Sequence, residues 1–403
     1  MIIKIVALVV LGVLCLFGIV KLLKLYSIHY VIRNKDFNIK QNTKFLVIIP
    51  MYKEQLRFEQ CIKAFDLLDY EKDKVTIVIS CTAKEEGTET TKMLVDEYLK
   101  NNNTNLKFEV VEYPKKNGNA AEQVNYAFKQ FKNEGDVLAI YNADSIPHPL
   151  SLKAANLEYQ DQKVNVVQQP IYFFNNIGSN LFSLGYSFHQ TLFDMTINMW
   201  SSLFSKGVQV TGRGLYIRCS FIGEEIYSTD FFCEDTALSS VLVSKGERIV
   251  SLSVFENNEP PPNLSAIIHQ HSVWYNTASD VKGLYSMLKN DPETKSKYIV
   301  FKLFEQSYKN MIWLFGAPIL WILGCIYPIT FLFLYLYCLL TITCLKYTFR
   351  FPIKNINVFY ASFSLMLFLL VLNLGPLLDI YKRFLVRLKF SDKHEKYKTT
   401  RGE

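Results

Sequence analysis

Phe45-Leu46-Val47-Ile48-Ile49-Pro50 is a short, continuous apolar run that ends at a proline, and a helical pattern over residues 54–68 follows it. The same alternation continues to residue 141. Further strand-like segments occupy residues 75–80, 108–112 and 137–141, and further helical patterns occupy residues 88–99 and 120–131. Buried strands that alternate with helices of this length predict an α/β fold, in which a mostly parallel sheet carries helices on both faces.

The residues that follow the strands are the candidates for ligand binding, because open α/β sheets bind ligands at the carboxyl ends of their strands. The segment Pro50-Met-Tyr52-Lys-Glu54 follows the first run, and Asn142-Ala-Asp144-Ser follows the last. An aspartate at a strand end suits a divalent metal that carries a nucleotide diphosphate, since hard cations prefer oxygen ligands. An ordinary Asx turn is the alternative. The sequence has no glycine-rich dinucleotide or P-loop motif, which disfavours dehydrogenase and ATPase functions.

An acidic pair, Glu234-Asp235, precedes a stretch that ends at Gly246. If this stretch is a helix closed by a glycine cap, the two acids lie at its N-terminus, where the helix dipole favours carboxylates. A simple capping role is the alternative interpretation.

The two ends of the 403-residue chain have the composition of membrane segments. Residues 5–20 form an uncharged apolar run between Lys4 and Lys21, about long enough to cross a bilayer. No small-residue cleavage site follows this run, so we expect a retained anchor rather than a signal peptide. Near the other end, no charged residue occurs between Lys309 and Lys346, and a third apolar run covers residues 358–378.

The stretch between Lys309 and Lys346 is too long for one crossing of a ~30 Å hydrocarbon core. Pro318 and Pro328 are its two break points, which leaves a tight two-helix hairpin or an interfacial helix followed by one crossing. The tail carries many basic residues, which places it in the cytosol by the positive-inside rule. These residues are Lys382, Arg383, Arg387, Lys389, Lys393, Lys396, Lys398 and Arg401.

Parity favours the interfacial helix, because the charges after the first anchor place the middle of the chain in the cytosol together with the tail. A disadvantage of this arrangement is that it places the short basic loop with Lys346, Arg350 and Lys354 on the outer side of the membrane. The expected organisation is therefore a transmembrane anchor (1–25), a linker (26–43), a cytosolic catalytic domain (44–280), amphipathic interfacial helices (281–320), two transmembrane helices (321–345 and 356–379) and a basic cytosolic tail (380–403).

The formal charge of +7 comes largely from the segments beside the membrane, where each basic residue gains about 1 kcal/mol near anionic lipid. We therefore expect membrane lipids, and not a nucleic acid, as partners. Four of the eight cysteines lie in apolar segments and the others lack Cys-x-x-Cys spacing. Neither a disulfide framework nor a structural zinc site is indicated.

The motifs resemble those of the inverting family 2 glycosyltransferases, which include cellulose, chitin and hyaluronan synthases. The match covers about residues 44–280, and the order of its pieces makes it specific. The pieces are residues 48–54, Lys116-Asn-Gly-Asn119 with Gln123-Val-Asn-Tyr-Ala127, Asn142-Ala-Asp144, Thr211-Gly-Arg-Gly-Leu-Tyr-Ile-Arg218, Glu234-Asp235, and Gln270-His-Ser-Val-Trp274. The last piece is similar to the Gln-x-x-Arg-Trp segment of polymer-forming members.

The resemblance implies a GT-A fold with a Rossmann-like sheet, and it implies roles for particular residues. Asp235 would be the catalytic base, and Asp144 would bind Mn²⁺ or Mg²⁺. The donor-binding residues would be Pro50, Tyr52, Glu54, Lys116, Asn119, Asn142, Asp144 and Arg213. The acceptor-binding residues would be Glu234, Gln270 and Trp274, although a core position explains the tryptophan equally well.

Three departures from the family pattern bear on the donor site. Asn142 replaces the first aspartate of the Asp-x-Asp motif, and Val273 replaces an arginine that contacts the donor diphosphate. Arg213, Lys116 or a metal would have to supply the missing charge. Residues 80–86 lack the aspartate pair that reads the nucleobase in relatives. Separately, the three prolines at 260–262 after residues 256–259 predict a rigid, exposed turn.

The expected function is a multi-pass plasma-membrane enzyme that adds sugar from a nucleotide sugar to a growing polysaccharide or lipid-linked glycan. A UDP-sugar is favoured over a GDP-sugar. Three crossings are too few to enclose a glycan channel, so either a second copy or another membrane protein completes one, or the enzyme adds a single sugar to a glycolipid. A non-catalytic scaffold or sensor that keeps the fold and a nucleotidyltransferase are the alternatives of other classes.

Overall fold

The computed structural model describes residues 2–32, 36–116, 118–175, 177, 180–200, 202, 209–231, 233–348 and 355–387. Its centre is a seven-stranded sheet with the strand order β3-β2-β1-β4-β7-β5-β8. The strands are β1 (Phe45–Pro50), β2 (Val75–Thr82), β3 (Lys107–Tyr113), β4 (Val137–Ile140), β5 (Val166–Gln168), β7 (Leu215–Arg218) and β8 (Ile249–Ser251). Only β7 runs antiparallel to its neighbours, so the predicted mostly parallel sheet is confirmed.

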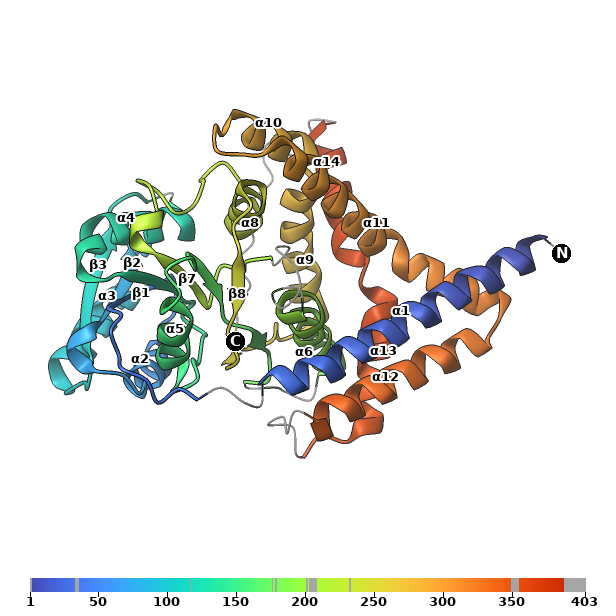
Figure 1. Cartoon of the computed structure of the whole chain (residues 1–403), viewed down its shortest axis with the longest axis horizontal. Coiled ribbons are helices and arrows are strands. Elements are labelled where there is room, and N and C mark those ends of the chain that lie inside the picture. The colour runs from blue at the N-terminus through green and yellow to red at the C-terminus, as the bar shows by residue number, and fades with distance from the viewer. Residues whose placement is uncertain are drawn as a thin grey trace.

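Both faces of this sheet are covered by helices, as Figure 1 shows. Side chains of β1 alternate between two cores: Val47 packs with the first and Ile48 with the second. Helices α2 (Phe58–Asp66), α3 (Thr91–Asn101) and α5 (Ser151–Tyr159) contribute to the first core, and α4 (Ala120–Phe131) and α8 (Glu234–Lys245) to the second. The apolar runs lack polar alternation because helices bury them on both sides.

The first predicted helix begins later than its pattern suggested. Lys53 adopts a positive φ of 55°, and the N–H of Arg57 donates to the Glu54 carbonyl across a turn. Residues 51–57 therefore form a loop at the end of β1, and α2 begins only at Phe58. Short 3₁₀ turns lie at Lys72–Lys74, Lys132–Glu134 and Cys219–Phe221.

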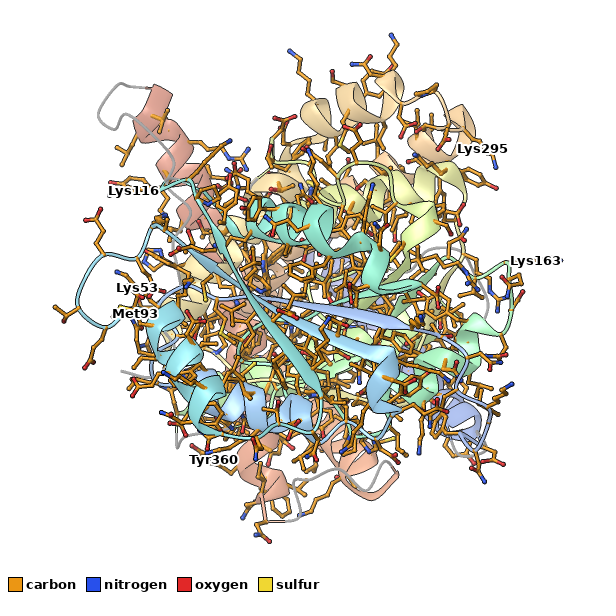
Figure 2. The ribbon with its side chains drawn as sticks, turned by 90° about the vertical axis from the view of Figure 1, so that its left-hand side faces the viewer. Lys53, Met93, Lys116, Lys163, Lys295 and Tyr360 are labelled. Carbon is orange, nitrogen blue, oxygen red and sulfur yellow. The ribbon has the colours of Figure 1, made fainter. Side chains whose placement is uncertain are left out.

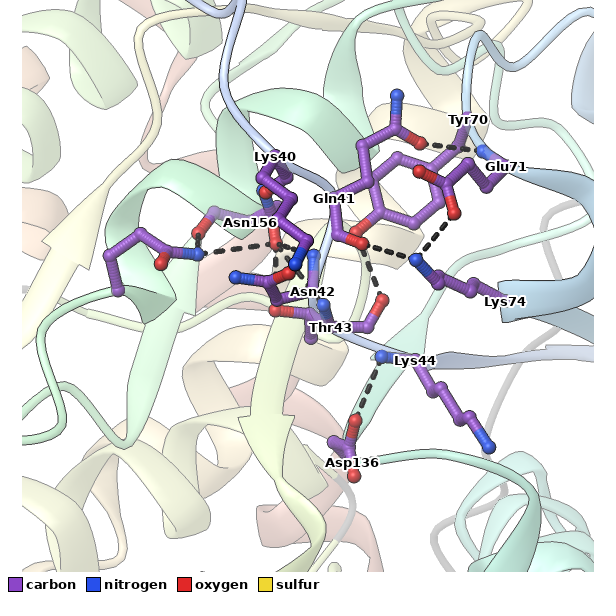
Figure 3. A network of polar contacts seen from close by, with 11 residues as sticks. Lys40, Gln41, Asn42, Thr43, Lys44, Tyr70, Glu71, Lys74, Asp136 and Asn156 are labelled. Atoms are coloured by element: carbon purple, nitrogen blue, oxygen red, sulfur yellow. Dashed lines mark hydrogen bonds and ion pairs between the residues drawn. The ribbon is translucent and has the colours of Figure 1, made fainter.

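The linker before β1 is held at the end of the sheet where the parallel strands begin (Figure 3). The Asn156 Oδ1 atom accepts hydrogen bonds from the N–H and the hydroxyl of Thr43 and from the N–H of Asn42. The Tyr70 hydroxyl donates to the Thr43 carbonyl over 2.9 Å. This network closes the amino end of the core.

The second half of the chain adds a helical layer beside β8. It contains α6 (Leu181–Phe193), the π-helical turn η3 (Asp194–Met199), α9 (Leu264–Ser279) and α10 (Val281–Asn290). A small second sheet pairs β6 (Ile171–Tyr172) with β9 (Glu256–Asn257). Helices α13 (Val358–Val371) and α14 (Leu374–Arg387) pack directly against α6 and α9.

Two glycines permit this close packing. A Cβ atom at Gly185 of α6 would lie 2.4 Å from the Ser364 carbonyl of α13, and one at Gly375 of α14 would lie 2.3 Å from the Cβ of His271 in α9. An Asp379–Arg383 ion pair in α14 also contacts Asn276 at the end of α9. The apolar C-terminal helices are therefore joined to the sheet domain by side-chain packing and hydrogen bonds.

Three long helices, α1 (Ile2–Ile32), α11 (Ser296–Ile326) and α12 (Ile329–Thr348), run together away from the sheet (Figure 1). Within the described residues, four helices are long and apolar enough to cross a membrane: these three and the α13–α14 stretch. Pro318 lies inside α11, whereas α11 and α12 meet at Tyr327 and Pro328. The transmembrane helices expected at both ends of the chain agree with these candidate spans.

Replacing Asn156 with alanine should destabilise the protein by about 1–3 kcal/mol, because it leaves buried donors of the linker unpaired. The thermal unfolding midpoint of the detergent-purified protein measures this effect. An unchanged midpoint would show that the linker network adds nothing to stability.

Candidate active site

The loops at the carboxyl ends of the parallel strands lie at one edge of the sheet. In Figure 2, Lys53 after β1 and Lys116 after β3 project on one side, and Lys163, before β5, projects on the other. The sequence-predicted donor residues after β1, β3 and β4 thus share the first of these edges.

The segment after β1 is held by the segment after β2. Pro50 ends the strand, and Tyr52 is half-buried, with the Nζ of Lys84 5.2 Å from its ring centroid. The N–H of Glu54 donates to Thr91, while Glu85 accepts hydrogen bonds from Thr91 and from the N–H of Lys53. Glu85 stands in the segment that replaces the family's aspartate pair, and here its carboxylate joins two loops.

The predicted residues after β3 have structural partners. Lys116 is exposed and forms a 2.6 Å ion pair with Glu86. The Asn119 side chain caps α4 by accepting the N–H of Glu122, whose carboxylate in turn accepts the N–H of Asn119. The capping box explains Asn119 without a ligand, and the exposed Lys116 lies at the rim of the edge.

The loop after β4 that carries Asp144 is held at several points. The N–H of Asn142 donates to the Ser145 hydroxyl over 3.1 Å. The backbone of Ile146 exchanges hydrogen bonds of 2.8 and 2.9 Å with Asn257 of β9. Asp144 itself is partly exposed. Its position is therefore set by the backbone around it.

Asp235 is tied to the loop before β7. Its Oδ2 accepts the N–H of Gly212 over 3.1 Å, and its Oδ1 accepts the N–H of Thr236 over 2.6 Å. The preceding Cys233 donates its N–H to the Thr277 hydroxyl at the end of α9. The expected helix is confirmed as α8, with Glu234 and Asp235 in its first turn and Gly246 in the left-handed C-cap at φ 82°.

Arg213, between Gly212 and Gly214, is almost completely buried and stacks on Phe173, with its Cζ 4.8 Å from the ring centroid. Two buried acids, Asp194 and Glu256, lie near enough for its positive charge to lower their pKa values. Burial raises the pKa of Asp194 to about 7, and the hydrogen bonds from Ile171 and Asn198 and the guanidinium of Arg213 only partly oppose this.

Burial also raises the pKa of Glu256 to about 7, against the opposing effects of Ser145 and Arg213. The expectation of an exposed turn at residues 260–262 is wrong for Pro260 and Pro261, which are buried, and holds only for Pro262. The preceding Glu256 and Asn258 are fully buried and Glu259 nearly so. Pairing of β9 with β6 draws these polar residues inward. An ion pair joins Glu259 to Arg57, beside Asp144.

The Gln270-to-Trp274 segment lies on α9, one side of which faces the C-terminal helices. Gln270 accepts a 2.9 Å hydrogen bond from Tyr186. Trp274 is partly buried and stacks on His271 at 5.3 Å between ring centroids. Burial lowers the pKa of His271 to about 3, so the ring is neutral. Trp274 thus takes part in an aromatic core, and its use for stacking on a sugar remains an expectation.

The structure brings together the Asp144 loop, the Gly212–Gly214 loop and Asp235, whereas Lys116 and Asn119 lie at the rim and Gln270 and Trp274 on α9. Sequence reasoning missed Asp194, Ser145 and Glu256. The two acids gave no local signal because their burial depends on contacts with distant segments.

Among the residues that the structure describes, no group of three His, Cys, Asp or Glu side chains is placed to hold a metal ion alone. The partly exposed carboxylate of Asp144 fits a divalent cation that takes its other ligands from a diphosphate.

The sequence agrees with two protein-family models. Glycosyl transferase family 2 matches residues 46–219, and glycosyl transferase family group 2 matches residues 137–374, more than half of the chain. The chain belongs to the family 2 glycosyltransferases. Transfer of a sugar from a nucleotide-sugar donor is the activity that this membership supports.

Solved structures share the fold at low sequence identity. The mannosyltransferase PcManGT from Pyrobaculum calidifontis, in complex with GDP-Man and Mn²⁺, has a TM-score of 0.56 at 14% identity, covering 94% of this chain and 99% of that chain. Staphylococcus aureus TarS 1-349 with UDP-GlcNAc has a TM-score of 0.48 at 15% identity, covering 85% and 92%. No curated protein matches the sequence significantly. The likeness to PcManGT and the mostly parallel sheet with flanking helices show a GT-A fold.

Replacing Asp194 with asparagine should flatten the dependence of stability on pH between about 4 and 7. In that interval the folded wild type keeps the Asp194 proton while the unfolded chain releases it, so stability falls as pH rises, by at most about 1.4 kcal/mol per pH unit for this group. Thermal unfolding midpoints of both proteins across this range measure the difference. Parallel curves would contradict the raised pKa.

Proposed function

We propose that the protein is a membrane-bound inverting glycosyltransferase that moves a sugar from a nucleotide sugar to a growing polysaccharide or a lipid-linked glycan. The observation that carries this proposal is the contact of Asp235 with the Gly212 N–H. It fixes a carboxylate at the edge of the sheet where the Asp144 loop also ends, so one acid can serve the acceptor and the other the donor.

In the proposed reaction, an acceptor hydroxyl oxygen attacks the anomeric carbon from the face opposite the nucleotide. The bond between that carbon and the diphosphate oxygen breaks, so the configuration inverts. Asp235 takes the hydroxyl proton as the new bond forms, because a carboxylate is too weak a base to remove it beforehand. The hydrogen bonds from Gly212 and Thr236 hold the carboxylate in one orientation.

Asp144 would hold Mn²⁺ or Mg²⁺ together with the donor diphosphate. Bound there, the ion supplies positive charge to the departing diphosphate. The charge that Val273 does not provide would otherwise have to come from the exposed Lys116, since Arg213 is buried beside Asp194 and Glu256. UDP-sugars stay the expected donors.

A glycosyltransferase that adds one sugar to a glycolipid is the second candidate. It is favoured by the direct packing of α13 and α14 on α6 and α9, which brings the membrane-like segments against the catalytic domain. A non-catalytic scaffold or sensor would have no use for the bonds that orient Asp235. The two enzymatic candidates differ in acceptor, not in the chemistry at Asp235.

The Asp235→Asn variant should lose at least 10²-fold of nucleotide diphosphate release, because asparagine cannot take a proton. Membranes that contain the protein are assayed with UDP- and GDP-sugars, including GDP-mannose, and with Mn²⁺ or Mg²⁺. Asp96→Asn, on the outer surface of α3 and paired with Lys92, is the matched control and should keep full activity. No release by the wild type from any donor would favour the scaffold.

We also propose that α1, α11 and α12 cross the membrane and that α13 and α14 stay on the side of the sheet domain. The turn between α11 and α12 lies beside the start of α1, where the Tyr327 hydroxyl donates to the Lys4 carbonyl. The far end of α12 packs with Leu25 of α1 and with α6. Helix α12 therefore returns toward the domain.

Two further features support a transmembrane hairpin of α11 and α12 over an interfacial helix followed by one crossing. Two turn residues, Leu372 and Asn373, separate α13 from α14, and α13 alone has 14 residues and spans about 21 Å, less than the ~30 Å core. In the most apolar part of the α13–α14 stretch, half of the residues are buried inside the protein, whereas in the most apolar part of α1 only 6% are buried. Lys346, at the returning end of α12, then lies on the cytosolic side, which the positive-inside rule favours.

Cysteine labelling tests this arrangement. In a cysteine-free background, Tyr327→Cys should react with a membrane-impermeant maleimide on intact cells, and Asn355→Cys should react only after permeabilisation. Asp96→Cys in the sheet domain is the control for intact membranes. The reverse pattern would support the interfacial helix followed by one crossing.

A further inference from the structure

Glu256 is a buried acid that connects two halves of the candidate site. It belongs to β9 and is fully buried. Its Oε1 accepts hydrogen bonds from the Ser145 hydroxyl and from the Asn258 amide. Among the described residues, no hydrogen-bond donor reaches its Oε2. The two carboxylate oxygens therefore have different neighbours.

The Oε1 atom is hydrogen-bonded to the loop that carries Asp144. Ser145 directly follows this aspartate, and its oxygen also accepts the N–H of Asn142. The backbone pairing of Ile146 with Asn257 attaches the same loop to the strand that carries Glu256. The hydroxyl of Ser145 is thus the side-chain link between Glu256 and the donor side.

The Oε2 atom faces the loop that contains Gly212 and Gly214, whose Gly212 N–H contacts Asp235. A Cβ atom at Gly214, whose φ is +57°, would lie 2.6 Å from this oxygen, so only glycine lets the loop pass so closely. The positive charge of Arg213 acts on the same carboxylate. Gly212, the residue before Arg213, donates its N–H to Asp235.

We propose that Glu256 is a positioning residue that fixes the Asp144 loop relative to Asp235, with one oxygen acting through Ser145 and the other through Arg213 and Gly214. This inference rests on the proposed function and assigns it a third acid. Glu256 does not touch the reacting atoms. It sets the separation between the group that places the donor and the base that activates the acceptor.

Two variants separate the two links. Ser145→Ala removes only the hydroxyl that joins Glu256 to the donor side. Glu256→Gln keeps an oxygen that accepts from Ser145, but it removes the charge opposite Arg213 and places an amide donor against the Gly214 loop. Asn156→Ala, at the opposite edge of the sheet, is the control for a loss of buried hydrogen bonds without a positioning role.

Electron paramagnetic resonance measures Mn²⁺ binding in the presence of the nucleoside diphosphate. The KM for the donor, kcat and the thermal unfolding midpoint are measured on the same variants. Ser145→Ala should weaken Mn²⁺ binding and raise the donor KM about tenfold, with kcat changed less than threefold. Glu256→Gln should lower kcat about 100-fold, with Mn²⁺ binding changed less than threefold. Asn156→Ala should lower only the thermal midpoint.

The proposal is overturned if Ser145→Ala and Glu256→Gln behave like Asn156→Ala, or if both variants change the same constant. Mn²⁺ binding needs no turnover, so it separates this inference from the proposed function. A wild type that binds Mn²⁺ but releases no nucleotide would overturn the proposed function, while unchanged binding in Ser145→Ala would overturn the donor-side link. A wild type that releases nucleotide but binds no Mn²⁺ would overturn the donor-side link and leave the proposed function standing.

Discussion

The reversed direction of β7 is the constraint on which the active site depends. The parallel strands bring their following loops to one edge, and an antiparallel strand brings its preceding loop to that same edge. Because β7 lies between β4 and β5 and runs against both, the glycines before it meet the loop after β4. Segments about 70 residues apart in the chain thus become neighbours, and Asp235 is attached to them by one backbone hydrogen bond.

Polar burial gives this meeting point its geometry. An arginine and two acids lie in the protein interior beside the loops, where any one of them without partners would cost several kcal/mol. Each has hydrogen-bonded or charged neighbours from other segments, which restricts the loops to a single arrangement. The same density of partners distinguishes Arg213 from the exposed Lys116, although both are cations near the donor edge.

Residues 45–141 could largely be predicted from sequence, because β1, β2 and β4 are mostly apolar runs and the helices between the strands are amphipathic. The bounds of β1 and α4 agree with their patterns. The later strands β5, β8 and β9 have only two or three residues, too few for a periodic pattern. Asp144 and Asp235 could be predicted from their places at a strand end and a helix start. Glu256 could not, because polar residues follow it in the sequence and its burial arises from the pairing of β9 with β6 and from contacts with distant segments. Pro318 did not break its helix, whereas Pro328 follows the end of one.

Helix α11 has a mechanical consequence for this glycosyltransferase. It is a single helix of 31 residues, about 46 Å long, that contacts α8 near its start and continues into the most apolar part of the chain. No flexible linker separates the catalytic domain from that segment. If α11 crosses the membrane as we propose, this helix fixes the height and tilt of the candidate site above the bilayer, and a change in bilayer thickness would shift the helix that begins with Glu234 and Asp235.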